Sequence, residues 1–430
     1  MARDPELLNH LLRNGVTPGG ELCRALGISP ATLSRIIARY PDQILRLGRT
    51  RGVRYGAYRS VPGIPSRVPV YRVDGSGEVR PVATLHLLAR GEHWLERQDG
   101  RGDFFAGLPP VVVDMAPQGY LGRNFGERHA ELGLPVLLRD WNDDHRLIAV
   151  ARRGEDCPGD LILGEESLDR YLAMDRVQAR RSLYPVLAMD SAQGGGSSAG
   201  GEHPKFTACV EGRQLIVKFT PGDGSPSDRR WRDLLACEAL ALEVLRAVGI
   251  EAARAEILEQ DGRRFLEVER FDRVGLRGRR GFLTAGPLDD DLYGDRDNWP
   301  ALAGRLHRDG LLSAADTRRV RLIDAYGQLI ANTDRHFGNI GFQADGLLHA
   351  PALHLAPAYD TLPMAFSPRS GIVPELQMQP PRARSGTLEV WQEARGLAAE
   401  FWRRVAGDVR ISAEFRAAAA GFAQGIQSEH

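Results

Sequence analysis

The sequence predicts an α+β protein of several domains, with a small helical domain preceding a longer mixed region. Its 430 residues exceed the usual length of roughly 150 residues for one domain. From residue 70 onward, short alternating apolar runs typical of strands are mixed with amphipathic helical stretches. A composition of 43% hydrophobic and 26% charged residues is ordinary for a globular protein, so two or three domains are expected.

Neither the hydropathy pattern nor the cysteines indicate a membrane protein or a secreted protein. No run of about 18 apolar residues is present, and residues 1–6 are too polar for a secretory leader. The four cysteines are scattered without a Cys-x-x-Cys pair, which indicates reduced thiols and argues against structural zinc. We therefore expect a cytoplasmic protein without a membrane partner.

Residues 1–62 are predicted to form a winged helix-turn-helix domain. Apolar spacing predicts helices over residues 6–13, 20–26 and 30–40, and Gly27, Ser29 and Pro30 suit a helix end, an N-cap and a first helical position. Residues 44–55 resemble a glycine-turned hairpin with four arginines, the usual make-up of a wing. The predicted core consists of Leu22, Cys23, Leu26, Ile28, Leu33, Ile36 and Ile37.

The same region concentrates positive charge in a chain whose formal net charge is zero. Residues 1–60 hold ten arginines and four acidic residues, a local charge of +6. Such charge favours contact with a phosphate backbone, although the domain could instead bind protein or pack on its neighbour. The residues expected to contact DNA are Thr32, Ser34, Arg35, Arg49, Arg51 and Arg54.

A linker with three prolines over residues 61–69 separates this domain from a mixed α/β subdomain over residues 70–165. Strands are expected at 70–73 and 82–88, and helices near 121–132 and 167–174. The histidines here lie too far apart in sequence to indicate a metal site.

The next region, residues 175–275, contains a glycine- and serine-rich segment and the only two lysines. Of 56 basic residues, 54 are arginine, and Lys205 and Lys218 are the exceptions. Lys218 ends a strand-like run, where its compact ammonium could reach a phosphate. The backbone of the glycine- and serine-rich segment at 190–205 could approach phosphate oxygens, or the segment could be a flexible linker. A helix is predicted over 231–248, on which Glu238 could pair with Lys218 or simply be solvated.

The strongest chemical signal is the string Asn-Thr-Asp-Arg-His-Phe-Gly-Asn at residues 332–339, with Asp360 about twenty residues later. It follows a predicted amphipathic helix over 321–331. The order is that used in kinase-type phosphoryl transfer: Asp334 to accept a hydroxyl proton, then Asn339 and Asp360 to hold Mg²⁺.

Together, these segments resemble the HipA-like serine/threonine kinases of bacterial toxin-antitoxin modules, and most closely those with their own amino-terminal helix-turn-helix domain. The resemblance covers roughly residues 70–410 and rests on the 332–339 string, Ser197 to Gly201, Val217-Lys218, the run 268–273 and Ala358 to Asp360. It implies a two-lobed, protein-kinase-like fold related to phosphoinositide kinases. The small lobe would span residues 175–275 and the mainly helical large lobe residues 276–430.

The resemblance also implies roles for individual residues, with ATP and Mg²⁺ as cofactors. Asp334 would be the catalytic base, and Asn339 and Asp360 would hold the metal. The implied nucleotide contacts are Ala199, Gly200, Gly201, Lys205, Lys218, Glu269, Arg270, Phe271, His336, Asn339 and Tyr359.

Inhibitory autophosphorylation is implied at Ser197, with Ser198 beside it. A phosphate there would add about two negative charges next to ATP and oppose the nucleotide-closed loop. Two features depart from the family pattern: a longer, glycine-rich loop with His203-Pro204 before Lys205, and Thr361 rather than glycine after Asp360.

Three functions remain open from the sequence. The first is a toxin kinase that phosphorylates a protein, such as an aminoacyl-tRNA synthetase or another translation factor, with an antitoxin as a candidate partner. The second is a DNA-binding regulator whose kinase fold senses nucleotide. The third is a small-molecule phosphotransferase of the aminoglycoside type, which is disfavoured by Asn332-Thr333 in place of His-Gly.

Overall fold

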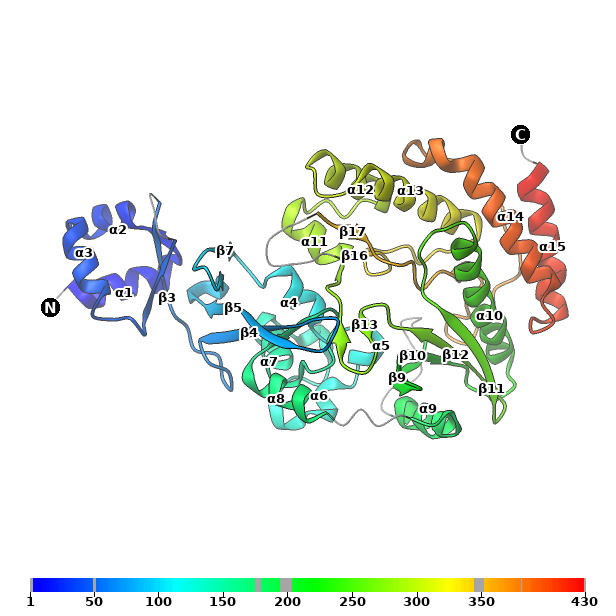
Figure 1. Cartoon of the computed structure of the whole chain (residues 1–430), viewed down its shortest axis with the longest axis horizontal. Coiled ribbons are helices and arrows are strands. Elements are labelled where there is room, and N and C mark those ends of the chain that lie inside the picture. The colour runs from blue at the N-terminus through cyan, green and yellow to red at the C-terminus, as the bar shows by residue number, and fades with distance from the viewer. Residues whose placement is uncertain are drawn as a thin grey trace. The chain divides into compact units, whose positions relative to one another are not determined.

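The computed structural model describes residues 3–48, 52–174, 179–193, 203–343, 352–379 and 381–428 (Figure 1). The chain divides into two units. The amino-terminal unit contains Met1–Asp74, Glu78–Pro117 and Phe125–Asp175, and the carboxyl-terminal unit contains Gly75–Gly77, Gln118–Asn124 and Arg176–His430. None of the described helices is long and apolar enough to cross a membrane.

The amino-terminal unit begins with three helices and a small antiparallel sheet of strand order β1-β3-β2. Gly27 ends the second helix in the left-handed conformation (φ 61°), and the Ser29 hydroxyl caps the third helix by accepting from the Thr32 amide at 3.2 Å. The expected helix end at Gly27 and helix start at Pro30 are therefore confirmed, whereas the third helix ends at Ile37 rather than near residue 40. The elements are α1 (Arg3–Asn14), β1 (Thr17–Pro18), α2 (Gly19–Leu26), α3 (Pro30–Ile37), β2 (Ile44–Leu47) and β3 (Arg54–Ala57).

The predicted apolar core of this region is confirmed. Leu22, Ile28, Leu33 and Ile36 are buried in one cluster with residues of α1 and β3. Cys23, Leu26 and Ile37 pack against that cluster from partly buried positions.

The rest of this unit is a five-stranded sheet of order β7-β6-β5-β4-β8, with antiparallel neighbours throughout. Its strands are β4 (Arg67–Val73), β5 (Val79–Leu87), β6 (His93–Arg97), β7 (Gly102–Phe105) and β8 (Leu161–Leu163). Its helices are α4 (Pro110–Met115), α6 (Phe125–Arg128), α7 (Asp143–Arg153) and α8 (Glu165–Ala173).

The helix expected near residues 121–132 is wrong as one continuous element. The chain forms α5 (Gly119–Gly122), α6 and a 3₁₀ turn (Ala130–Leu132) instead. Gly119 has a φ of 60°, a conformation that glycine adopts readily. At Gly126 a Cβ would lie 2.6 Å from the Pro135 carbonyl oxygen, so the absence of a side chain allows the two backbone segments to approach closely.

The carboxyl-terminal unit contains a four-stranded antiparallel sheet with a long helix, α10 (Pro226–Ala247), packed against it. The sheet order is β11-β12-β10-β9, and Ser225 caps α10 by accepting from the Asp228 amide at 3.1 Å. The elements are α9 (Tyr184–Gln193), β9 (Lys205–Val210), β10 (Arg213–Phe219), β11 (Ala255–Gln260) and β12 (Arg263–Glu269).

The remainder of this unit is mainly helical, as predicted. Its helices are α11 (Ala285–Leu292), α12 (Trp299–Arg308), α13 (Ala314–Leu329), α14 (Trp391–Gly407) and α15 (Ala413–Ser428). Its short strands are β13 (Arg273–Val274), β14 (Gly278–Arg279), β15 (Leu283–Thr284), β16 (Gly341–Gln343) and β17 (His354–Leu355). Its described 3₁₀ turns are Arg181–Leu183, Met364–Phe366 and Ser385–Val390, and the amino-terminal unit also contains Ala89–Gly91 and Leu138–Asp140.

We expect replacement of Trp402 by alanine to lower the free energy of unfolding by about 3–5 kcal/mol. The indole is fully buried on α14, contacts Phe401 and Phe422, and donates to the Leu329 carbonyl oxygen at 3.2 Å. Urea denaturation followed by circular dichroism measures the change. Val409→Ala, at an 86% exposed position, should change it by less than about 0.5 kcal/mol. A similarly small loss for Trp402→Ala would contradict a central packing role.

Candidate active site

Helix α13 delivers the 332–339 loop at its carboxyl end. The helix stops at Leu329, and Ala331 adopts a left-handed φ of 60°, which turns the chain. Asn332 is buried, and its side-chain oxygen accepts from the Asp334 amide at 3.0 Å. The Asp334 carboxylate itself is 45% exposed, so it is open to a ligand.

Asn339 folds back on Asp334 within this loop. Its side-chain nitrogen donates to the Asp334 carbonyl oxygen at 2.8 Å and lies 3.3 Å from a carboxylate oxygen. The other carboxylate oxygen lies 3.7 Å from Nε2 of His336. Since the amide nitrogen of Asn339 is engaged, its amide oxygen is the atom that could take a metal ion.

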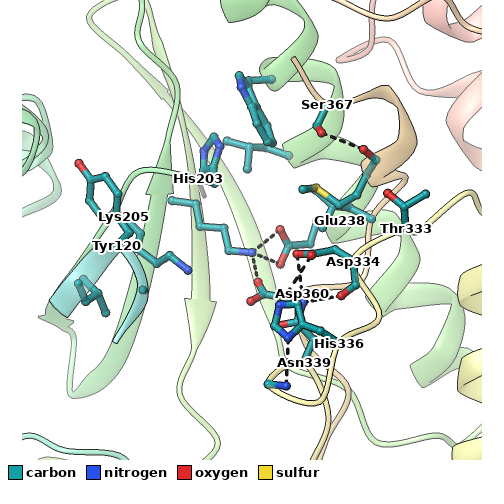
Figure 2. A pocket seen from close by; sticks show the side chains of 18 of the residues that line it. Tyr120, His203, Lys205, Glu238, Thr333, Asp334, His336, Asn339, Asp360 and Ser367 are labelled. Atoms are coloured by element: carbon teal, nitrogen blue, oxygen red, sulfur yellow. Dashed lines mark hydrogen bonds and ion pairs between the residues drawn. The ribbon is translucent and has the colours of Figure 1, made fainter. Parts of the chain in front are cut away.

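A buried ionic cluster joins Lys218 on β10 to two carboxylates. Lys218 Nζ lies 2.7 Å from each carboxylate oxygen of Glu238 on α10, and it also donates to Asp360. Figure 2 shows Glu238 close to Asp360. The Glu238 side chain is fully buried and that of Lys218 is 7% exposed. The alternative of a solvated Glu238 is therefore excluded.

Lys218 and Asp360 stabilise each other's charged forms, whereas burial raises the pKa of Glu238 despite the nearby Lys218. Burial acts to lower the pKa of Lys218, but Asp360 and Glu238 outweigh it and raise that pKa above its ordinary value. Burial acts to raise the pKa of Asp360, but Lys218 and Lys205 outweigh it and lower that pKa. Asp360 also has a left-handed φ of 47°, a strained conformation for a residue with a side chain.

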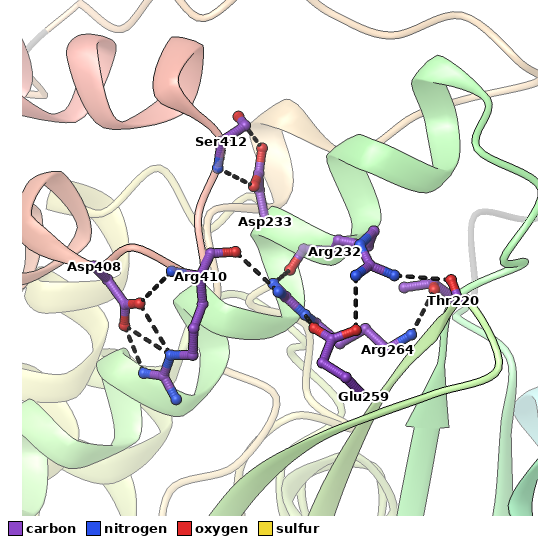
Figure 3. Close-up of polar contacts among 9 residues, drawn as sticks. Thr220, Arg232, Asp233, Glu259, Arg264, Asp408, Arg410 and Ser412 are labelled. Atoms are coloured by element: carbon purple, nitrogen blue, oxygen red, sulfur yellow. Dashed lines mark hydrogen bonds and ion pairs between the residues drawn. The ribbon is translucent and has the colours of Figure 1, made fainter.

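Helix α10 is held in place by polar contacts with the sheet and with the α14–α15 connection (Figure 3). Arg264 of β12, which is buried, donates to the Arg232 carbonyl oxygen at 2.7 Å and to the Arg410 carbonyl oxygen at 2.9 Å. Asp233 of α10 accepts from the amide and the hydroxyl of Ser412 at 2.7 and 2.6 Å. These contacts hold α10, which carries Glu238, against the sheet that carries Lys218.

A pocket of about 870 Å³ contains the ionic cluster and the loop, and its volume suits a nucleotide-sized ligand. Figure 2 shows Lys205 and Glu238 from the small sheet and its helix, with Asp334 and Asn339 from the loop. Both lysines of the chain line this pocket. The predicted site residues that line it are Lys205, Lys218, Asp334, His336, Asn339 and Asp360.

Four predicted nucleotide contacts do not line the pocket. They are Glu269, Arg270, Phe271 and Tyr359. The amides of Glu269 and Arg270 donate to backbone carbonyl oxygens of Arg254 and Gln214 instead. The ring of Tyr359 packs 5.6 Å from that of Phe271, and its hydroxyl donates to the Gly338 carbonyl oxygen at 2.8 Å. The structure thus uses Tyr359 to hold the loop and leaves a hinge at 269–271 a prediction.

Several other predicted residues lie outside the described part of the chain. These are Ser197, Ser198, Ala199, Gly200 and Gly201, and in the amino-terminal region Arg49 and Arg51.

The predicted DNA contacts that are described lie on α3 and β3. Ser34 and Arg35 are exposed, and Thr32 is partly exposed. Thr32 accepts from the Arg35 guanidinium at 3.3 Å. Arg54 lies over the ring of Phe104 at 5.1 Å, so its guanidinium already has an aromatic partner.

Sequence reasoning missed other residues of the pocket. Trp231 and Leu235 precede Glu238 by two turns and one turn on α10, so helical spacing could have identified them. His203 packs on the ring of Trp231 at 4.4 Å, and its burial beside Lys218 and Lys205 holds its pKa well below the ordinary value. The segment 118–121 also lines the pocket, and no local signal indicated it.

Two family models match the sequence. They are a YjjJ-like toxin middle domain over residues 64–172 and a HipA-like C-terminal domain over residues 197–424. The toxin YjjJ of Escherichia coli (strain K12) is 34% identical over 424 residues, which cover 95% of this chain and 94% of that protein.

Among solved structures, a chain of the HipA, HipB and operator DNA complex of Shewanella oneidensis MR-1 matches with a TM-score of 0.51. The match covers 84% of this chain and 95% of that chain at 14% identity. This likeness shows the fold alone.

We expect Lys218→Met to lower the free energy of unfolding by about 3–5 kcal/mol, because it leaves Glu238 buried without its cation. The double variant Lys218→Met/Glu238→Gln should recover most of this loss. Thermal and urea denaturation check both values. Lys205→Met is the matched comparison, since Lys205 is partly exposed, makes no direct ion pair with the other described residues of the cluster and should change stability much less than Lys218→Met. Equal losses for the two lysines would contradict the buried cluster.

Proposed function

The chain belongs to the family of HipA-like toxins, and we propose that it is an ATP-dependent kinase that phosphorylates serine or threonine residues of a protein. The observation that supports this most is the meeting of Lys218, Asp334 and Asp360 in one pocket. Three separate segments supply these groups. Kinase-type phosphoryl transfer uses a lysine to hold phosphates, a carboxylate to accept the hydroxyl proton and a second carboxylate to hold Mg²⁺.

In this proposal Asp334 accepts the proton of the acceptor hydroxyl. The hydroxyl oxygen then forms a bond to the γ-phosphorus of ATP, the bond to the bridging oxygen breaks, and ADP leaves. Lys218 binds the α- and β-phosphates as a point charge, with Glu238 keeping the ammonium oriented. Lys205 and His336 line the same space.

Asp360 and Asn339 would hold Mg²⁺, which when bound neutralises phosphate charge. Mg²⁺ in such sites uses one or two carboxylate or amide oxygens and completes its shell with phosphates and water. The donor set here fits that requirement. The described residues contain no cluster of three or more His, Cys, Asp or Glu that could hold a metal by itself.

Family membership supports a cellular role as a toxin of a toxin-antitoxin system, with a translation component as the proposed protein substrate and a separate antitoxin as a candidate partner. Inhibitory autophosphorylation at Ser197 or Ser198 is part of the same proposal. Phosphate added to a segment adjoining Lys205 would oppose binding of the ATP phosphates by repulsion.

We also propose that the first 62 residues form a winged helix-turn-helix domain that binds DNA. The exposed side chains of α3 and the local charge of +6 support this. If the pocket binds nucleotide without transferring phosphate, the same observations support a nucleotide-sensing regulator instead.

Purified protein with Mg²⁺ and labelled ATP should phosphorylate itself or a lysate protein, and Asp334→Asn should slow the reaction by about 10²–10⁴-fold. Intact-mass analysis should find a phosphate that depends on Asp334, and peptide mapping should locate it at Ser197 or Ser198. Asp261→Asn, in the exposed turn between β11 and β12, is the matched control and should retain full activity.

Absence of transfer to any protein by the wild type would overturn the kinase proposal. Transfer to an aminoglycoside but to no protein would favour the small-molecule phosphotransferase.

Binding to a mixed-sequence DNA duplex should weaken steeply with salt, because phosphate contacts release counterions. Arg35→Ala and Arg51→Ala should each weaken binding and reduce the slope of log affinity against log salt by about 1. Arg318→Gln is the control and should leave binding unchanged. It removes an exposed arginine of α13, outside the first 62 residues, that pairs with Glu393 of α14. Binding that does not respond to salt would contradict the proposal.

A further inference from the structure

Arg335, next to Asp334 in the loop, directs its side chain back onto α13 rather than toward the pocket. Its Nε donates to Asp324 Oδ1 at 3.0 Å, and its guanidinium also donates to the Asn332 carbonyl oxygen. The Arg335 side chain is 17% exposed and that of Asp324 is 9% exposed. The Arg335 guanidinium therefore joins Asp324 of the helix to the backbone of Asn332 at the start of the loop.

Asp324 is itself held in position. Its second carboxylate oxygen accepts from the side-chain nitrogen of Gln328 at 2.8 Å, one helical turn later. Both residues are buried. A buried carboxylate needs such partners, because an unpaired buried charge costs several kcal/mol.

Glycine at position 327 provides the space for this arrangement. A Cβ there would lie 2.7 Å from Cδ of Arg335, closer than real contacts allow. Cδ lies in the middle of the side chain, and the guanidinium beyond it has partners on two sides. The side chain therefore could not yield without losing those hydrogen bonds. The Gly327 carbonyl oxygen also accepts from the Asn332 amide at 2.8 Å.

We propose that Asp324 and Gly327 are positioning residues for Asp334 and act through Arg335. Asp324, Gly327 and Gln328 lie on one face of the last two turns of α13, directly beneath the loop. Asn332 accepts from the Asp334 amide, and Arg335 binds the Asn332 carbonyl oxygen, so the helix determines where the Asp334 carboxylate lies. Lysine could not replace Arg335, since a single ammonium lacks the planar fork that reaches two acceptors.

The catalytic part of this inference rests on the proposed kinase function. Displacement of a reacting group by about 1 Å costs about 10²-fold in rate. Asp324→Asn and Gly327→Ala should therefore each lower kcat for phosphoryl transfer by about that factor. They should change KM for ATP much less than kcat, because two of the groups proposed to hold ATP and Mg²⁺, Lys218 and Asp360, lie on other segments.

The chain offers a matched control for each variant. Asp316→Asn removes the charge of another buried aspartate on α13, which pairs with Arg319 at 2.6 Å. Gly304→Ala adds a methyl group on α12 where nothing lies within 4 Å. Both controls should retain the wild-type kcat.

A double-mutant cycle and hydrogen exchange separate positioning from general stabilisation. If Asp324 acts through Arg335, Asp324→Asn combined with Arg335→Lys should lose no more activity than the worse single variant. In the folded variants, exchange of the amides of residues 332–339 should accelerate, while exchange in α12 stays unchanged.

Unchanged kcat and unchanged loop exchange in folded Asp324→Asn and Gly327→Ala would overturn the inference. Lower thermal stability with normal kcat and normal loop exchange would overturn it as well, since that result describes a merely structural role. If Asp324→Asn does not fold, Gly327→Ala decides. If the wild type transfers no phosphate, the proposed function fails, and loop exchange still decides whether Asp324 and Gly327 position the loop.

Discussion

The site depends on one buried ammonium group shared by two carboxylates. Lys218, Glu238 and Asp360 come from a strand, a helix and the segment after β17, and the Glu238 carboxylate has no exposure to solvent. Charges buried in this way are tolerated only when their partners are in place, because an uncompensated one costs several kcal/mol. The ionic cluster therefore requires the small sheet, α10 and the Asp360 segment to keep a defined mutual arrangement.

The surrounding structure meets that requirement with further buried polar contacts. Arg264 joins the sheet to α10 and to the α14–α15 connection, and Asp233 joins α10 to Ser412. Near the pocket, Ala331 and Asp360 have left-handed backbone conformations, which are strained for residues with a side chain and persist only where neighbouring contacts determine them. These contacts and turns accompany the meeting of Asp334 and Lys218 in one pocket.

Much of the local structure could be predicted because it depends on near neighbours in the chain. The Ser29 cap, the proline after it and the helix end at Gly27 all follow from patterns within a few residues. Apolar spacing predicted the helix over 231–248, but α10 begins earlier, at Pro226 after the Ser225 cap. The helix expected near 121–132 was wrong as one continuous element, because apolar spacing within the segment carries no information on backbone approaches from elsewhere, such as that of Pro135 to Gly126 inside α6. The predicted hinge residues 269–271 lie outside the pocket lining, and the amides of Glu269 and Arg270 donate to the carbonyl oxygens of Arg254 and Gln214.

By itself, the sequence determined which chemical groups the protein holds and in what order. The sequence alone shows Asp334, Asn339 and Asp360, and it shows that only two of the 56 basic residues are lysine. Only the tertiary structure decided that both lysines line one pocket, that Glu238 is the partner of Lys218, and that Arg335 binds Asp324 rather than a ligand. The physical reason is that caps and helical periods act over a few residues. The pairing of buried charges, in contrast, depends on which distant segments pack together, and that is determined by the folded chain as a whole.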